Sequence, residues 1–241
     1  MPHAVAARFQ ELARVSDGRI GLLPAVPDDE MSSWATPVPE DVRAFLGTVG
    51  GFTIGDRHVF DFNHPDNHVP VANENWPLGA DSSTYWLLHS DGSATTYYVD
   101  VENGAWGRVF SFWEEPHARL VAPSLLSWAD NLASGLEAAL RTDGDLGQAF
   151  SDWLFGNEES LSRHPENTVQ PMPAATARVS DDPEIAAAAA HLPDDAFLAD
   201  LRKAVYPTEI PFASVVPYGE EVTYARSANG RFLTATIIPD P

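Results

Sequence analysis

Residues 95–112 read TTYYVDVENGAWGRVFSF and predict a β-hairpin. β-Branched and aromatic residues alternate before Asn103-Gly104 and are frequent after it. Asn-Gly is the favoured pair for a two-residue hairpin turn, because both central positions of that turn need a positive φ. The two arms, residues 95–101 and 106–112, are therefore expected to pair as antiparallel strands.

The segments around this hairpin predict further strands and the helices that cover them. Short strands are expected at residues 52–54, 58–62 and 84–88. Helices are expected at 4–15, from Pro39 to a stop at Gly50-Gly51, at 123–141 behind a Ser124 or Ser127 cap, and at 146–155. Strands grouped apart from helices indicate an α+β fold, an antiparallel sheet meander packed by N-terminal and C-terminal helices.

The composition changes near residue 155. All seven tryptophans lie within the first 153 residues, and four prolines interrupt residues 156–183. We therefore expect a domain at 1–155, a Pro-containing linker or irregular excursion at 156–183, and a small unit or extension at 184–241. In that last part the pattern predicts helices at 184–192 and 194–205 and strands at 212–216, 221–226 and 231–238. These elements would form a smaller α+β C-terminal extension.

The chain is strongly acidic along its whole length. It has 241 residues, with 35 Asp and Glu against 14 Lys and Arg, which gives a formal net charge of −21. Residues 1–141 carry −11 and residues 142–241 carry −10, so the acidity does not belong to one tail. A duplex nucleic-acid binder or an anionic-membrane binder needs clustered Lys and Arg, which this chain lacks. The charge indicates either attraction to a basic partner or general solubility.

Composition also restricts the location and the chemistry. Cysteine is absent, so neither a disulfide framework nor a thiolate metal site is possible. No apolar run approaches the ~20 residues that span a bilayer, and the first 14 residues lack the apolar region of a secretory signal. We expect a soluble cytoplasmic protein.

No catalytic signature is present. The chain has no G-x-S-x-G elbow, no G-x-G-x-x-G loop and no Walker A loop. Its adjacent carboxylate pairs, such as Asp28-Asp29, diverge on helices and strands alike, which suits surface or cap positions better than acid–base dyads. We therefore expect no enzyme activity and no cofactor.

A histidine-rich window keeps one enzymatic alternative open. His58, Asp61, His64 and His68 combine ligand types that zinc or iron accepts, which would suit a metal-dependent hydrolase. Pro65 interrupts the spacing of four between His64 and His68, so a shared helical face is not expected. A solvated polar loop explains the same residues, and we expect no metal site here.

Three segments, taken in order, resemble a known family. The first is VPEDVRAFL at 38–46 with VGGF at 49–52. The second is HSDGS at 89–93 leading into YYVD at 97–100. The third is GAWGRVF at 104–110, followed by VAPSL at 121–125 and Trp128. This set, over about residues 1–141, resembles the SUKH superfamily, whose namesake is a fungal regulator of cell-wall glucan synthesis and whose bacterial members are mostly immunity proteins of polymorphic toxin systems.

The resemblance implies a non-enzymatic binding protein, most simply an immunity protein that neutralises a cognate toxin. Its acidity would suit a basic toxin such as a nuclease, whose cleft it could occupy. A regulatory or scaffold protein with an unrelated partner is the alternative. The expected partner-binding residues are acidic positions in polar, loop-rich sequence: Asp56, Asp61, Asp66, Glu74, Asp81, Glu114 and Glu115.

Overall fold

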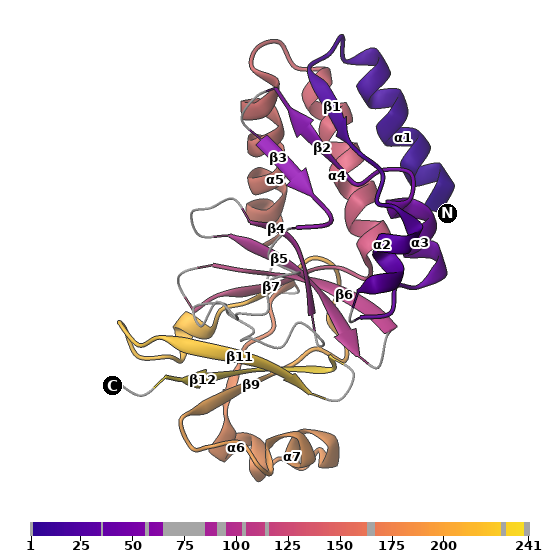
Figure 1. Cartoon of the computed structure of the whole chain (residues 1–241). Coiled ribbons are helices and arrows are strands. Elements are labelled where there is room, and N and C mark those ends of the chain that lie inside the picture. Colours follow the sequence, from indigo (N-terminus) through magenta and orange to yellow (C-terminus); the bar gives the residue numbers. More distant parts are fainter. Residues whose placement is uncertain are drawn as a thin grey trace.

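The computed structural model describes residues 2–34, 36–55, 58–64, 85–90, 95–102, 105–113, 116–162, 167–227 and 230–238. Within these ranges the chain forms three antiparallel sheets and separate helical layers (Figure 1). The α+β class expected from the sequence is confirmed. None of the helices in these ranges has the length and apolar character needed to cross a membrane.

The central layer is a five-stranded antiparallel sheet in the order β10-β7-β6-β5-β4. Its strands are β4 (Tyr85–Ser90), β5 (Thr96–Glu102), β6 (Ala105–Phe112), β7 (Ala118–Ala122) and β10 (Thr208–Ile210). β5 pairs with β6 with Glu102 opposite Ala105, so the expected hairpin is confirmed. β10 comes from the C-terminal part of the chain and extends the meander beyond β7.

Helices and a second small sheet cover one face of the central sheet (Figure 1). The helices are α1 (Pro2–Val15), α2 (Asp28–Ser33), α3 (Glu40–Leu46), α4 (Leu125–Leu140) and α5 (Leu146–Ser162). The small sheet has the order β1-β2-β3, with β1 (Ile20–Leu23), β2 (Gly51–Ile54) and β3 (His58–Asp61). α4 begins at Leu125, two residues after the expected start at Pro123, and Ser124, one of the two expected caps, accepts a hydrogen bond from the Ser127 amide through its hydroxyl.

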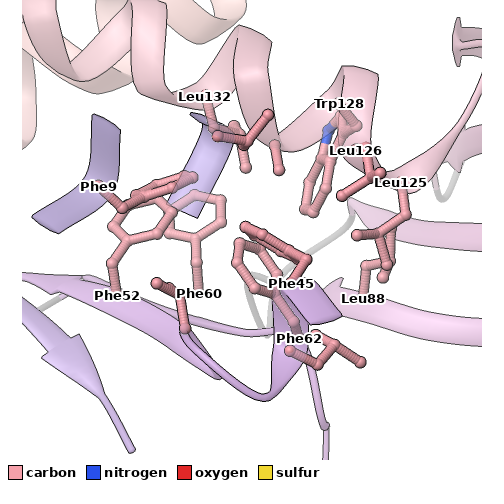
Figure 2. Close-up of a cluster of buried hydrophobic side chains, with 14 of the residues drawn as sticks. Phe9, Phe45, Phe52, Phe60, Phe62, Leu88, Leu125, Leu126, Trp128 and Leu132 are labelled. Atoms are coloured by element: carbon pink, nitrogen blue, oxygen red, sulfur yellow. The ribbon is translucent and has the colours of Figure 1, made fainter. Parts of the chain in front are cut away.

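An aromatic core joins these elements. Figure 2 shows Trp128 and Leu132 of α4 pointing toward a group of phenylalanines that includes Phe9, Phe45 and Phe62. The Trp128 and Phe62 rings meet edge to face, with centroids 5.8 Å apart, and the Phe45 and Phe62 centroids are 5.5 Å apart. Aromatic pairs in such geometry add to the free energy gained by burying their area. The core therefore holds α1 and α3 in fixed positions against α4.

A four-stranded sheet lies on the other face of the central sheet (Figure 1). Its order is β11-β12-β9-β8, with β8 (Met172–Pro173), β9 (Ala196–Asp200), β11 (Val222–Ser227) and β12 (Phe232–Ile237). Tyr224 of β11 contacts Phe112 of the central sheet, with ring centroids 4.7 Å apart. α6 (Ala174–Arg178) and α7 (Pro183–Ala189) pack on the outer side, where Ala177 and Ala189 join Leu198 and Phe232.

The C-terminal elements differ from the expected ones in two places. The helix expected at 194–205 is wrong, because residues 196–200 form β9 in the middle of the sheet. Leu198 faces α6 and α7 while Phe197 and Ala199 face the central sheet, so both faces are buried and the apolar run lacks the alternation that marks a strand. The strand expected at 212–216 is also wrong: a 3₁₀ turn, Phe212–Ser214, follows Pro211, and the strand is β10 before it.

The described parts of residues 156–183, which are 156–162 and 167–183, contain regular elements. α5 continues to Ser162, and β8 and α6 occupy residues 172–178. Two of the prolines stand at element boundaries: Pro173 lies directly before α6, and Pro183 is in the first turn of α7, where a missing amide hydrogen costs nothing. These two prolines therefore delimit short elements, while the division of the chain at 1–155, 156–183 and 184–241 stays a prediction.

Gly50 and Gly51 do not end α3 as expected. The helix ends at Leu46 and is capped by Gly47, and Gly51 already belongs to β2. A Cβ atom at position 50 would lie 2.0 Å from the Pro24 carbonyl oxygen, and one at Gly51 would lie 2.1 Å from the Phe60 carbonyl oxygen. These glycines allow neighbouring backbones to approach closely, which is a different role from helix termination.

Candidate functional site

One of the seven expected acidic binding residues lies within the described ranges. Asp61 ends β3, and its Oδ1 accepts a hydrogen bond of 2.9 Å from the Asn63 amide. The Asn63 side chain in turn donates to Glu30 Oε1 of α2 at 2.8 Å. Asp61 is thus linked to the acidic helix α2. The other six residues lie outside the described ranges: Asp56, Asp66, Glu74, Asp81, Glu114 and Glu115.

A hollow of about 470 Å³ lies beside α2, on the surface formed by α2, α3 and the chain that leads into α2. Its lining is apolar in the middle and charged at its edge. The lining residues are Ala25, Val26, Pro27, Asp28, Met31, Glu40, Arg43, Ala44 and Gly47.

The two helices that form the hollow begin in the same way. Pro27 precedes α2 and Pro39 precedes α3, and both first turns are acidic, with Asp28, Asp29 and Glu30 in α2 and Glu40 and Asp41 in α3. Carboxylates in a first turn are favoured by the positive end of the helix dipole. The apolar side of α3 is buried, and the Val26 amide donates to the Leu46 carbonyl at 2.9 Å, so the floor of the hollow is fixed to the core.

An ion pair joins α2 to α3 at one edge of the hollow. Arg43 Nη1 donates to Asp28 Oδ1 at 2.6 Å and also reaches the Asp28 carbonyl and Ser32 Oγ, each at 3.1 Å. The Arg43 side chain is 29% exposed and that of Asp28 is 77% exposed. Glu40, the first residue of α3 and three residues before Arg43, is exposed and pairs with no cation among the described residues. The hollow therefore presents one neutralised carboxylate and one available carboxylate.

Most of the chain's cations are paired internally. Eight of the 13 arginines form an ion pair with Asp or Glu within the described ranges. They are Arg8, Arg14, Arg43, Arg119, Arg178, Arg202, Arg226 and Arg231. The excess of carboxylates over cations is then left largely to the surface, and the field around the molecule is negative.

The most enclosed of these pairs fastens β10 to the central sheet. Glu209 of β10 lies opposite Arg119 of β7, and its carboxylate contacts both Arg119 Nε and His117 Nε2. The Arg119 guanidinium also lies over the Trp113 ring, 3.9 Å from its centroid. The Arg119 and Glu209 side chains are each 7% exposed. This group is enclosed by protein and explains how the C-terminal part attaches, so we assign it a structural role.

A second charged group stabilises the four-stranded sheet. Arg202 hydrogen-bonds to Asp182 at 2.7 Å and to Asp200 at 2.6 Å, and lies over the Phe232 ring. These hydrogen bonds lower the pKa of Asp182 to about 2, and the Asp200 pKa is lowered for the same reason. The group holds the loop before α7 against the end of β9.

The metal-site alternative gains no support from the described residues. His58 begins β3, Asp61 ends it, and His64 follows. Across the described ranges no group of three His, Asp or Glu is arranged to hold a metal ion. His68 lies outside the described ranges.

Sequence reasoning missed the hollow because it treated Asp28-Asp29 as a solvated pair and did not expect α2. A usable signal was present: Pro-Asp-Asp-Glu at 27–30 and Pro-Glu-Asp at 39–41 are two similar helix starts twelve residues apart. In the structure the acidic first turns of both helices, Asp28 and Glu40, line the same hollow.

Comparison with known proteins gave no match to a family model, to a curated protein or to a solved structure.

Proposed function

We propose that this chain is a cytoplasmic, non-enzymatic binding protein that neutralises a basic protein toxin, as an immunity protein of the SUKH type. The observation that carries the proposal is the acid-edged hollow on a surface whose carboxylates outnumber its cations. The order of motifs along residues 1–141 supports it independently. A nuclease holds phosphates in a basic cleft, and an acidic protein bound there excludes the nucleic acid.

Electrostatics gives this mode of action a kinetic advantage. Opposite net charges steer two proteins together and raise the association rate, with an effect that salt screens. Capture of a toxin before it meets its substrate depends on that rate. An apolar patch inside the charged region then supplies the short-range contacts that keep the complex together.

Co-expression tests the proposal. The product of the neighbouring gene is expressed in a bacterial host with and without this chain, and growth is measured. We expect the neighbour to arrest growth alone and this chain to restore it, with a complex recovered at low salt. No rescue and no complex at low salt would contradict the proposal. A stable complex with a harmless neighbour would favour the regulatory or scaffold alternative.

A further inference from the structure

The hollow lined by α2 and α3 combines an apolar floor with an acidic edge, and few side chains can make favourable contacts with both. Its floor contains Val26, Met31 and Ala44, and Val26 and Met31 are buried at 5% and 2% exposure. Its edge carries Asp28 and Glu40. An occupant must therefore bring apolar atoms to the floor and a positive charge to the edge.

Other occupants fit less well. A purely apolar side chain would remove water from the Glu40 carboxylate without supplying a partner, which costs free energy. An acidic side chain would be repelled by Glu40 and by the negative field of the whole chain. A long basic side chain meets both demands, because its aliphatic stem covers apolar surface while its charged end reaches polar groups.

Arg43 shows how this edge receives a guanidinium group. Its Nη1 atom hydrogen-bonds to the Asp28 carboxylate, the Asp28 carbonyl and the Ser32 hydroxyl. This pairing satisfies Asp28 and leaves Glu40 as the carboxylate that faces an incoming cation. We infer that the hollow is an anchor site for one lysine or arginine side chain of a basic protein partner, with the stem on Met31 and Ala44 and the charge at Glu40.

This inference rests on the proposed function and adds the place and the chemistry of contact. One basic residue seated in a hollow at the centre of an interface is a common way for a few side chains to dominate affinity. The surrounding acidic residues of α2, which continue through Glu30 and Asn63 to Asp61, would then contribute mainly to steering.

A titration followed by NMR tests the anchor site with a defined probe. Labelled protein at low salt is titrated with N-acetyl-L-arginine methylamide, and amide and methionine methyl shifts are recorded. We expect saturable shifts confined to α2, α3 and the Met31 methyl group. The citrulline analogue, which has the same shape without the charge, should bind about two- to fivefold more weakly, the range for a partly exposed ion pair.

A matched pair of variants assigns the charge. Glu40→Gln removes the available carboxylate at the hollow, while Glu220→Gln removes an exposed carboxylate in the turn before β11. Both positions are exposed, so both variants should fold, which their amide spectra will show. We expect Glu40→Gln to weaken arginine-probe binding by about two- to fivefold and Glu220→Gln to leave it unchanged.

Three results would overturn the anchor site: no shifts at the hollow, equal binding of the citrulline probe, or equal binding by Glu40→Gln and the wild type. The outcome separates this inference from the proposed function. If the arginine probe causes no NMR shifts at the hollow but the chain still restores growth, the hollow is not the anchor site and the immunity function stands. If the probe binds at the hollow but the chain does not restore growth, the hollow is a site for a basic residue whose partner is not the toxin.

Discussion

Replacing Glu209 with alanine should strongly destabilise the fold, because this carboxylate joins the last strand of the central sheet to its neighbour. Glu209 contacts Arg119 and His117 at once, and Arg119 is held between the carboxylate and the Trp113 ring. The Arg119 and Glu209 side chains are each only 7% exposed, so water cannot replace the lost partner. The variant leaves a buried guanidinium without its carboxylate.

The size of the effect follows from that enclosure. Breaking a buried ion pair by removing one partner costs about 3–5 kcal/mol, most of it the penalty for the charge that remains. Domains of this kind are stable by about 5–15 kcal/mol, so the loss is a large fraction of the total. With a urea dependence of about 1–3 kcal/mol per molar, the unfolding midpoint should fall by about 1 M or more.

Urea unfolding followed by tryptophan fluorescence and circular dichroism measures the change. The surface variant Glu11→Gln is the control, since its ion pair with Arg14 is exposed and its loss should leave the midpoint unchanged. The double variant Arg119→Met with Glu209→Leu should recover most of the lost stability, because it removes both buried charges together. A urea midpoint for Glu209→Ala within error of the wild type would show that this buried ion pair does not stabilise the attachment of β10.

Three further changes test other parts of the fold. Gly135→Ala should destabilise by about 1–3 kcal/mol in urea unfolding, because its Cβ would lie 2.3 Å from the Trp153 ring; a neutral effect would mean that α4 and α5 pack differently. Ser124→Ala should cost about 1 kcal/mol through loss of the α4 cap, and an unchanged thermal midpoint would exclude that cap. Asp182, with its pKa near 2 beside Arg202, contributes stability above its ordinary value of 3.8 that is lost as pH falls toward 2. Asp182→Asn should therefore be less stable than the wild type at pH 6, and its thermal midpoint should fall less between pH 4 and pH 2. Equal slopes of midpoint against pH for the two proteins would contradict the lowered pKa.

Local sequence signals sufficed where local forces decide the structure. Asn103-Gly104 predicted the hairpin because few other residue pairs reach a positive φ twice. The start of α4 was predicted to within two residues, with Ser124 or Ser127 as its cap, and the structure assigns the cap to Ser124, whose hydroxyl satisfies an otherwise unpaired amide. Strand β9 could not be predicted in this way, because burial on both faces removed its alternation and only the surrounding sheet makes it a strand.

The hollow depends on contacts that no short window of sequence contains. Asp28 and Arg43 are fifteen residues apart, and their ion pair fixes α2 against α3 only after both helices have packed on the core. Net charge and motif order predicted an acidic protein-binding surface. They did not indicate which carboxylate faces an apolar floor, because that depends on Met31 being buried beneath it.

The rate of association with the neighbouring gene's product shows whether the acidic surface captures a basic partner. Purified wild type, Glu40→Gln and Glu220→Gln would be compared at two salt concentrations, with dissociation measured in the same experiment. We expect a complex whose association slows as salt rises, and faster dissociation for Glu40→Gln alone. A complex that forms at the same rate at both salt concentrations, with equal dissociation for all three proteins, would contradict this expectation.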